Sequence, residues 1–253
     1  TNTKWPKLQS LYKISRTTLD KPRQLQLKIG DYQIAAIPTG LFALDGGAMF
    51  GVVPKSIWQK LNPPDDNNMC TWAMRCLLVE NGDRLLLIDN GIGDKQDAKF
   101  FGYYYLNGDD SLQKSLAKHG FGPDDVTDVV LTHLHFDHVG GAVNKINEEL
   151  VLAFPNATYW VSEPHWNLAL NPNKRERASF LSENILPLQA SGKLKLISIP
   201  AFKSDSSLQE IYFSSSISCL VVNGHTQGML LPKIQTDKGV IVYMADLLPS
   251  IGH

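Results

Sequence analysis

The chain has 253 residues, of which 43% are hydrophobic and 19% are charged, a balance typical of a globular protein with a substantial core. Its net charge of -1 gives no general attraction to nucleic acid or to an anionic membrane surface. No apolar run approaches the ~18 residues of a membrane span. We therefore expect a small-molecule partner, with no nucleic acid and no membrane involved, and a homodimer is left open.

Cysteine content and the first residue bear on location. Three cysteines (Cys70, Cys76 and Cys219) make a poor disulfide framework, which favours a cytoplasmic protein with buried thiols and leaves one bridge open. The chain opens with Thr1 rather than Met, so a removed export signal also stays open. No repeat or linker divides the sequence, and we expect one domain over residues 1–253, with residues 1–24 wrapping over its body.

The first half of the chain predicts strands, a hairpin and a helix. Leu25, Leu27 and Ile29 alternate with polar residues, and residues 34–37 follow as a second short apolar run. Asn81-Gly82 between two apolar runs is a strong hairpin signal. A helix is expected over residues 112–118, capped by one of residues 109–111 and ended by Gly120.

The second half alternates between predicted strands and helices, which favours stacked sheets with helices outside them. The strand over residues 126–131 delivers Thr132 and His133 at its end. Further strands are expected at 157–161, 194–199, 217–222 and 240–244, and helices at 164–170 and 174–190 with Gly192 as the stop. The charged run from Lys174 to Arg177 is typical of a solvated helix face.

A dense group of metal-ligand side chains follows the strand at 126–131. The string Thr132-His-Leu-His-Phe-Asp-His-Val-Gly-Gly141 holds His133, His135, Asp137 and His138 in six positions. Imidazole and carboxylate suit zinc, and also manganese, iron or cobalt. In extended chain His133 and His135 project to one face, while Asp137 and His138 lie where the chain turns toward a second ion.

Two later residues occupy similar positions. His225 follows the apolar strand at 217–222 within Asn223-Gly-His-Thr-Gln-Gly228, and Asp246 follows the strand that begins at residue 240. Strand ends presenting ligands from distant parts of a chain are how a rigid sheet preorganises a metal site. Taken singly, His225 fits a structural histidine and Asp246 a cap or turn residue.

Together these motifs resemble the metallo-β-lactamase superfamily. Leu87-Ile-Asp-Asn-Gly91 is similar to that family's strand ending in Asp-Thr-Gly, with Asn90 at the Thr position. Residues 45–55 are similar to the branch of acyl-homoserine lactone lactonases and methyl parathion hydrolase-like enzymes. The resemblance implies an α+β, four-layer αβ/βα sandwich of two mixed sheets flanked by helices.

The resemblance also implies the ligand roles. His133, His135 and His225 would hold one divalent ion, Asp137 and His138 the second, and Asp246 would bridge the two. The family takes a last histidine for the second ion from well beyond the bridging aspartate. Here either a C-terminal segment beyond residue 253 is missing, or His253 substitutes.

The expected reaction is hydrolysis by a metal-activated water, with zinc as the first choice of metal. Asp137 and His138 are the candidate catalytic residues, Asp137 because it can orient the nucleophile or pass a proton to the leaving group. Phe50, Phe136 and Tyr103 are candidate pocket residues, for which core packing or an oligomer interface is the alternative. His119 and His165 are expected to be structural.

Several functions fit this pattern. The leading one is a lactonase or esterase-like hydrolase of small, largely apolar substrates. A glyoxalase II-like thioester hydrolase and a phosphotriester hydrolase are alternatives, and a nuclease is disfavoured because the chain is not basic. A non-catalytic metal-binding protein is the alternative from a different class.

Overall fold

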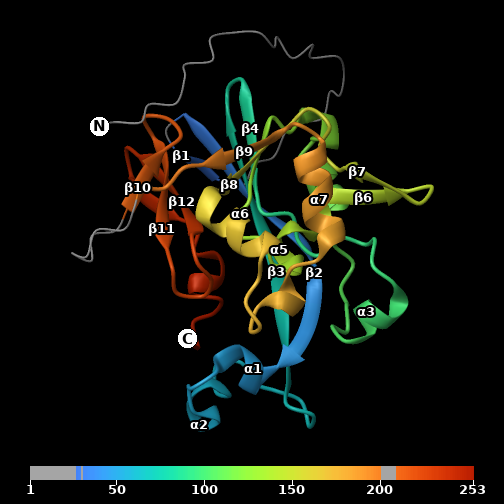
Figure 1. Ribbon diagram of the computed structural model, residues 1–253. Helices are drawn as coiled ribbons and strands as arrows, with labels where there is room; N and C mark the ends of the chain where they lie inside the picture. The colour runs from blue at the N-terminus through green and yellow to red at the C-terminus, as the bar shows by residue number, and fades with distance from the viewer. Residues whose placement is uncertain (1–26, 30, 201–208) are drawn as a thin grey trace.

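The computed structural model describes residues 27–29, 31–200 and 209–253, so residues 1–24 and the predicted strand residue Leu25 lie outside the described parts. Two main β-sheets and one separate hairpin make up the fold (Figure 1). The strands of the large sheet are β1 (Leu27–Ile29), β2 (Tyr32–Asp45), β3 (Met69–Asn81), β4 (Arg84–Ile88), β5 (Asp128–Val130), β8 (Thr158–Ser162) and β9 (Leu194–Ile197). The hairpin consists of β6 (Val143–Ile146) and β7 (Glu149–Leu152).

The large sheet has two halves with different connections. Its order is β1-β2-β3-β4-β5-β8-β9, antiparallel from β1 to β4 and parallel from β4 to β9. The long β2 and β3 pair from Gln33↔Glu80 to Asp45↔Met69, with a bulge between Pro38 and Gly40. In the parallel half all carboxyl ends meet at one edge, which positions whatever side chains follow these strands.

The second sheet is antiparallel throughout, so the expectation of two mixed sheets was wrong for this one. Its strands, in order, are β10 (Gln209–Tyr212), β11 (Ile217–Val222), β12 (Met229–Thr236) and β13 (Gly239–Val242). The connections between them are only a few residues long, which suits hairpins and not parallel crossovers. The α+β arrangement expected from the sequence, with two sheets stacked on each other and helices packed on the large one, is nevertheless confirmed.

The core fills both faces of the large sheet. Residues alternate along β4: Leu85 and Leu87 join the core under the helices, while Leu86 and Ile88 pack against the second sheet. The α-helices are α1 (Gly46–Phe50), α2 (Lys55–Trp58), α3 (Ala98–Gly102), α4 (Leu112–Lys118), α5 (Phe136–Val139), α6 (Glu163–Leu170) and α7 (Ser182–Ala190). In Figure 1, α1 and α2 lie at the far end of β2 and β3, and α7 lies across the large sheet from the red second sheet. Within the described ranges no α-helix follows β9.

Local signals in the sequence place several elements correctly. The predicted helix at 112–118 is α4, with the Ser111 side chain accepting from Lys114 N–H, and the hairpin at Asn81-Gly82 joins β3 to β4. The predicted helix at 174–190 was wrong in its first half, where a 3-10 turn (Arg177–Ser179) precedes α7. The cause is Asn173, whose Oδ1 accepts from the N–H groups of Arg175 and Glu176 and holds the chain in a turn.

In the portions of the chain that the structure describes, no helix is long and apolar enough to cross a membrane.

Candidate metal centre

The site lies where the edges of the two sheets meet. Asp89 follows β4, and Thr132 and His133 follow β5, at the carboxyl edge of the parallel strands. His225 lies in the turn between β11 and β12, and Asp246 lies in a 3-10 turn (Ala245–Leu247) after β13. A backbone hydrogen bond from Leu230 N to Thr132 O (2.9 Å) joins the two edges.

Three imidazoles form the first group of ligand-type side chains. Ring centroids lie 4.6 Å apart for His133 and His135 and 4.8 Å apart for His135 and His225. His225 Nε2 is 3.0 Å from His135 Nδ1. The group satisfies the spacing of a metal site, with one nitrogen of each ring within 4.8 Å of the others.

His138 and two carboxylates form the second group. His138 Nε2 lies 3.2 Å from Asp246 Oδ1 and 3.7 Å from Asp137 Oδ2, and His133 also borders this group. The other oxygen of the same carboxylate, Asp246 Oδ2, lies 3.5 Å from His225 Nε2. Asp246 therefore spans the two groups, and all six ligand residues expected from the sequence lie together.

Asp89 fixes the orientation of two of these histidines. Its carboxylate accepts from His138 Nδ1 (2.8 Å), from Thr132 N (2.9 Å) and from Thr132 Oγ1 (2.8 Å). The threonine hydroxyl gives its only hydrogen to Asp89 and so accepts from His133 Nδ1, 3.0 Å away. Both rings thus carry hydrogen on Nδ1, and their Nε2 atoms face the cluster.

His165, expected to be structural, joins the two ligand loops. It is fully buried near the start of α6; its Nε2 accepts from Leu134 N and its Nδ1 donates to Gln227 O, both at 2.8 Å. Leu134 lies between two of the histidines, and Gln227 lies two residues after His225. Ser162 adds a hydrogen bond from its hydroxyl to Gly228 O. One corner of the fold therefore holds both loops.

Burial and charge set the protonation of the cluster. Burial lowers the pKa of His133 and His135 well below the usual histidine range, and it lowers that of His225 as well. Burial also disfavours the charged form of His138, but the carboxylates around that ring together raise its pKa well above the usual range. These carboxylates belong to Asp246, Asp137 and Asp89.

The donor set fits a divalent transition metal. The three rings of the first group are neutral at pH 7, as ligands must be, and His133 Nε2 is buried with no hydrogen-bond partner among the described residues. Leaving a buried polar atom unpaired is costly, so an ion at this position would satisfy it. Imidazole with carboxylate is a preferred ligand combination for zinc.

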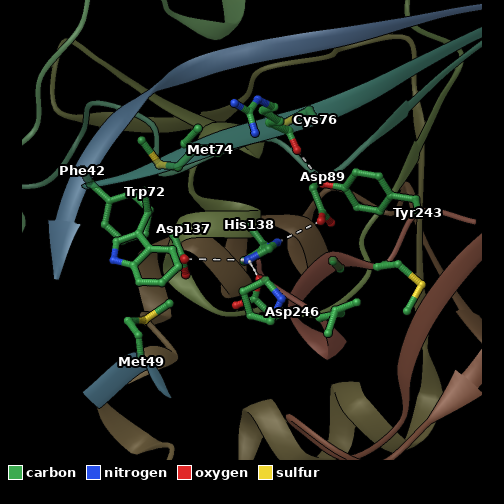
Figure 2. A pocket seen from close by; sticks show the side chains of 17 residues that line it. Phe42, Met49, Trp72, Met74, Cys76, Asp89, Asp137, His138, Tyr243 and Asp246 are labelled. Atoms are coloured by element: carbon green, nitrogen blue, oxygen red, sulfur yellow. Dashed lines mark hydrogen bonds and ion pairs between the residues drawn. The ribbon is translucent and has the colours of Figure 1, made fainter. Parts of the chain in front are cut away.

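A cavity of about 210 Å³ opens beside the second group. Asp137, His138 and Asp246 lie on one side, and Figure 2 shows an apolar wall facing them. This wall comes from β2, β3 and α1 and comprises Phe42, Met49, Trp72 and Met74.

The three pocket residues expected from the sequence do not line this cavity. Phe50 is buried in a stack with Trp58, and Phe136 packs against Phe100 and Tyr104. Tyr103 is 63% exposed on the surface. Core packing, the alternative given for these aromatics, describes the first two.

His253 does not join the cluster. Its ring stacks on Phe50, Nδ1 pairs with Ser250 Oγ at 3.0 Å and Nε2 pairs with Met49 O at 3.1 Å. Both ring nitrogens are thus engaged elsewhere, which removes His253 as the substitute for the last ligand.

Sequence reasoning missed Glu176. The run from Lys174 to Arg177 predicted a solvated face, yet Glu176 is only 6% exposed, with Oε2 3.7 Å from His135 Nε2. Asn171-Pro172-Asn173, directly before the run, was the local signal of a turn there.

Comparisons with known proteins agree with this geometry. The family model described as the metallo-beta-lactamase superfamily matches residues 75–179. N-acyl homoserine lactonase AiiA of Bacillus thuringiensis subsp. kurstaki is 27% identical over 161 residues, 60% of this chain and 54% of that protein. The chain thus spans about half the length of the curated relatives it matches.

Two solved structures cover more of the chain. A probable metal-dependent hydrolase from Staphylococcus aureus has a TM-score of 0.79 and 28% identity, covering 90% of this chain and 77% of that one. AidC, a dizinc quorum-quenching lactonase, has a TM-score of 0.66 and 25% identity, covering 88% and 74%. The fold and the clustered His and Asp side chains are similar to those of these metal-dependent hydrolases. Residues 75–179 thus match the metallo-β-lactamase superfamily, and the curated and structural relatives of the chain include N-acyl homoserine lactonases.

Proposed function

We propose that this chain is a metal-dependent hydrolase that cleaves a lactone or ester bond in small, largely apolar substrates at a pair of divalent ions, zinc in the first instance. The observation that supports this most is the position of Asp246. One of its oxygens faces His138 and the other faces His225, as a carboxylate shared between two ions requires.

The ligand roles follow from that arrangement. His133, His135 and His225 would hold the first ion, and Asp137 and His138 the second, with Asp246 shared. When bound, such ions lower the pKa of a coordinated water toward ~7 and polarise the bond to be cleaved. Asp89 and Thr132 keep two of the rings in the tautomer this needs.

Asp137 has a second role in the proposal. It lines the cavity, and burial, with the neighbouring Asp246, raises its pKa to about 6. A carboxyl group at that position can orient the attacking water or hand a proton to the leaving oxygen.

The substrate class is suggested by the cavity. Phe42, Trp72 and Met74 offer an apolar surface opposite the carboxylates, where the acyl part of a lactone or ester would be removed from water. The relatives named as homoserine lactonases support a lactone as the first substrate to test.

The test combines metal analysis with a substrate panel. Protein purified without chelator should carry two transition-metal ions per chain and hydrolyse lactones faster than thioesters, phosphotriesters or β-lactams. His133→Ala should lower that hydrolysis by more than about a hundredfold, since even outer partners of ligands are worth about 10- to 100-fold. Preferred turnover of thioesters or phosphotriesters would select one of the alternative hydrolases, and a metal-free, inactive protein would refute the proposal.

A further inference from the structure

We infer that Glu176 is a positioning residue of the metal centre. Its carboxylate faces Nε2 of His135 and orients that ring, so that Nδ1 faces the ion that His133 and His225 would also bind. This inference rests on the proposed metal centre and deepens it.

The first observation is the placement of the two ring nitrogens of His135. Nδ1 lies 3.0 Å from His225 Nε2 and so faces the cluster. Nε2 is buried, has no hydrogen-bond partner among the described residues, and lies 3.7 Å from Glu176 Oε2. The ring is thus flanked by ligand-type nitrogens on one side and by a carboxylate on the other.

The second observation is how firmly that carboxylate is held. Glu176 Oε2 accepts from Thr226 Oγ1 at 2.5 Å, and Oε1 accepts from Asn173 Nδ2 and Arg175 Nη2, both at 3.0 Å. Burying a carboxylate is costly unless donors of this kind compensate it. Three donors aimed at one buried side chain indicate that its position is specified.

The same segment also contacts the loop of another ligand. Thr226 directly follows His225, and Arg175 Nη2 donates to His225 O at 3.1 Å. Residues 173–176 therefore brace the histidine of the β11–β12 turn while their carboxylate faces His135.

The chemical consequence concerns the tautomer of His135. A neutral imidazole carries one hydrogen, and an ionised carboxylate can only accept. Glu176 therefore favours hydrogen on Nε2, which leaves the Nδ1 lone pair for a cation and increases its basicity. A glutamine can present its amide hydrogens to Nε2 instead, favouring the opposite tautomer.

The test measures metal binding rather than turnover. Zinc affinity of the full chain is determined by competition with a chromogenic chelator, and the ligand environment by the visible absorption of the cobalt-substituted protein. Glu176→Gln should weaken the tighter zinc site at least about tenfold, the lower end expected for such outer partners. It should also alter the cobalt spectrum.

Glu210→Gln is the matched control. Glu210 also accepts from a hydroxyl, Ser218 Oγ, and from a cation, Lys233 Nζ, but on the second sheet. Its substitution should leave zinc affinity and the cobalt spectrum unchanged. Thr226→Val, which removes the hydroxyl that holds Glu176, should weaken zinc binding by a smaller factor and serves if Glu176→Gln does not fold.

The outcomes are distinguishable. If the parent chain binds no zinc, the proposed function fails and this inference fails with it. If the parent binds zinc and the Glu176 and Thr226 variants bind equally tightly, even with a lower melting temperature, Glu176 is only structural and the inference is overturned.

Discussion

The two sheets present their site residues in different ways. His133 and His135 follow β5, a parallel strand of the large sheet, and are 0% and 7% exposed. They lie beside the hydrogen bonds that Asp89 accepts from Thr132 and His138. His225 comes from the β11–β12 turn and Asp246 from the 3-10 turn after β13, and their side chains are 32% and 20% exposed. The first pair depends on the sheet itself. The second pair depends on a few side-chain contacts, which single substitutions could remove without unfolding the protein.

Asp89→Ala should have the largest effect, because it removes the support on the large-sheet side. The substitution leaves buried donors of Thr132 and His138 unpaired, at about 1–3 kcal/mol each. We expect the free energy of unfolding to fall by about 3 kcal/mol or more, with loss of bound metal, measured by urea titration and metal analysis.

Asp128→Ala is the control for that prediction. Asp128 is another buried carboxylate, paired with Arg84 and Trp160 at the opposite end of β5. It should lower stability and leave bound metal unchanged, whereas unaltered metal content in Asp89→Ala would contradict the role given to Asp89.

His165→Leu should have the next largest effect, and mainly on the second-sheet side. It removes the hydrogen bonds to Leu134 N and Gln227 O, worth about 2 kcal/mol together. Hydrogen exchange should accelerate over residues 223–229 and stay unchanged over 86–88. His165→Asn, which can keep the donor to Gln227, should be milder; equal acceleration in both segments would refute the comparison.

Trp72→Ala tests the apolar wall through KM, measured well below the melting temperature because Trp72 also packs in the core beside Phe50. Losing part of this wall should raise KM for a long-chain acyl lactone about tenfold, or about 1.4 kcal/mol, with kcat little changed. Tyr103→Ala, which alters an exposed aromatic away from the cavity, is the control. Equal kinetics for both variants would mean that the acyl chain binds elsewhere.

Arg175→Ala should have the smallest effect, because its side chain is 73% exposed. A solvated contact of this kind contributes up to about 1 kcal/mol, so zinc affinity should fall less than about fivefold. Lys174→Ala, one residue away, should have no effect. A loss of zinc affinity as large as that of Glu176→Gln would mean that the Arg175 guanidinium group, and not the Glu176 carboxylate, positions the site.

Much of this organisation could be predicted from the sequence because its signals are local. Ser111 marks the start of α4, and the apolar run at 217–222 is β11 to the residue. The six expected ligands come together because each follows a strand or lies in the dense motif after β5. The resemblance drawn from those motifs is confirmed by the family match over residues 75–179.

The rest depended on tertiary contacts that no local pattern records. Glu176 lies in a charged run, and only the approach of His135 and Thr226 makes it a buried carboxylate. The wall residues Trp72 and Met74 lie on β3, where alternation shows two faces but not which of them borders a cavity. His165 has no ligand-like spacing, because its partners lie 31 and 62 residues away.

Anomalous diffraction at the zinc edge, from crystals of protein purified without chelator, tests the central claim most directly. The account predicts two peaks about 3.5–4 Å apart, one beside His133, His135 and His225 and one beside Asp137 and His138, with Asp246 between them. A crystal with no peak at the cluster, or with zinc bound only elsewhere on the chain, would contradict it.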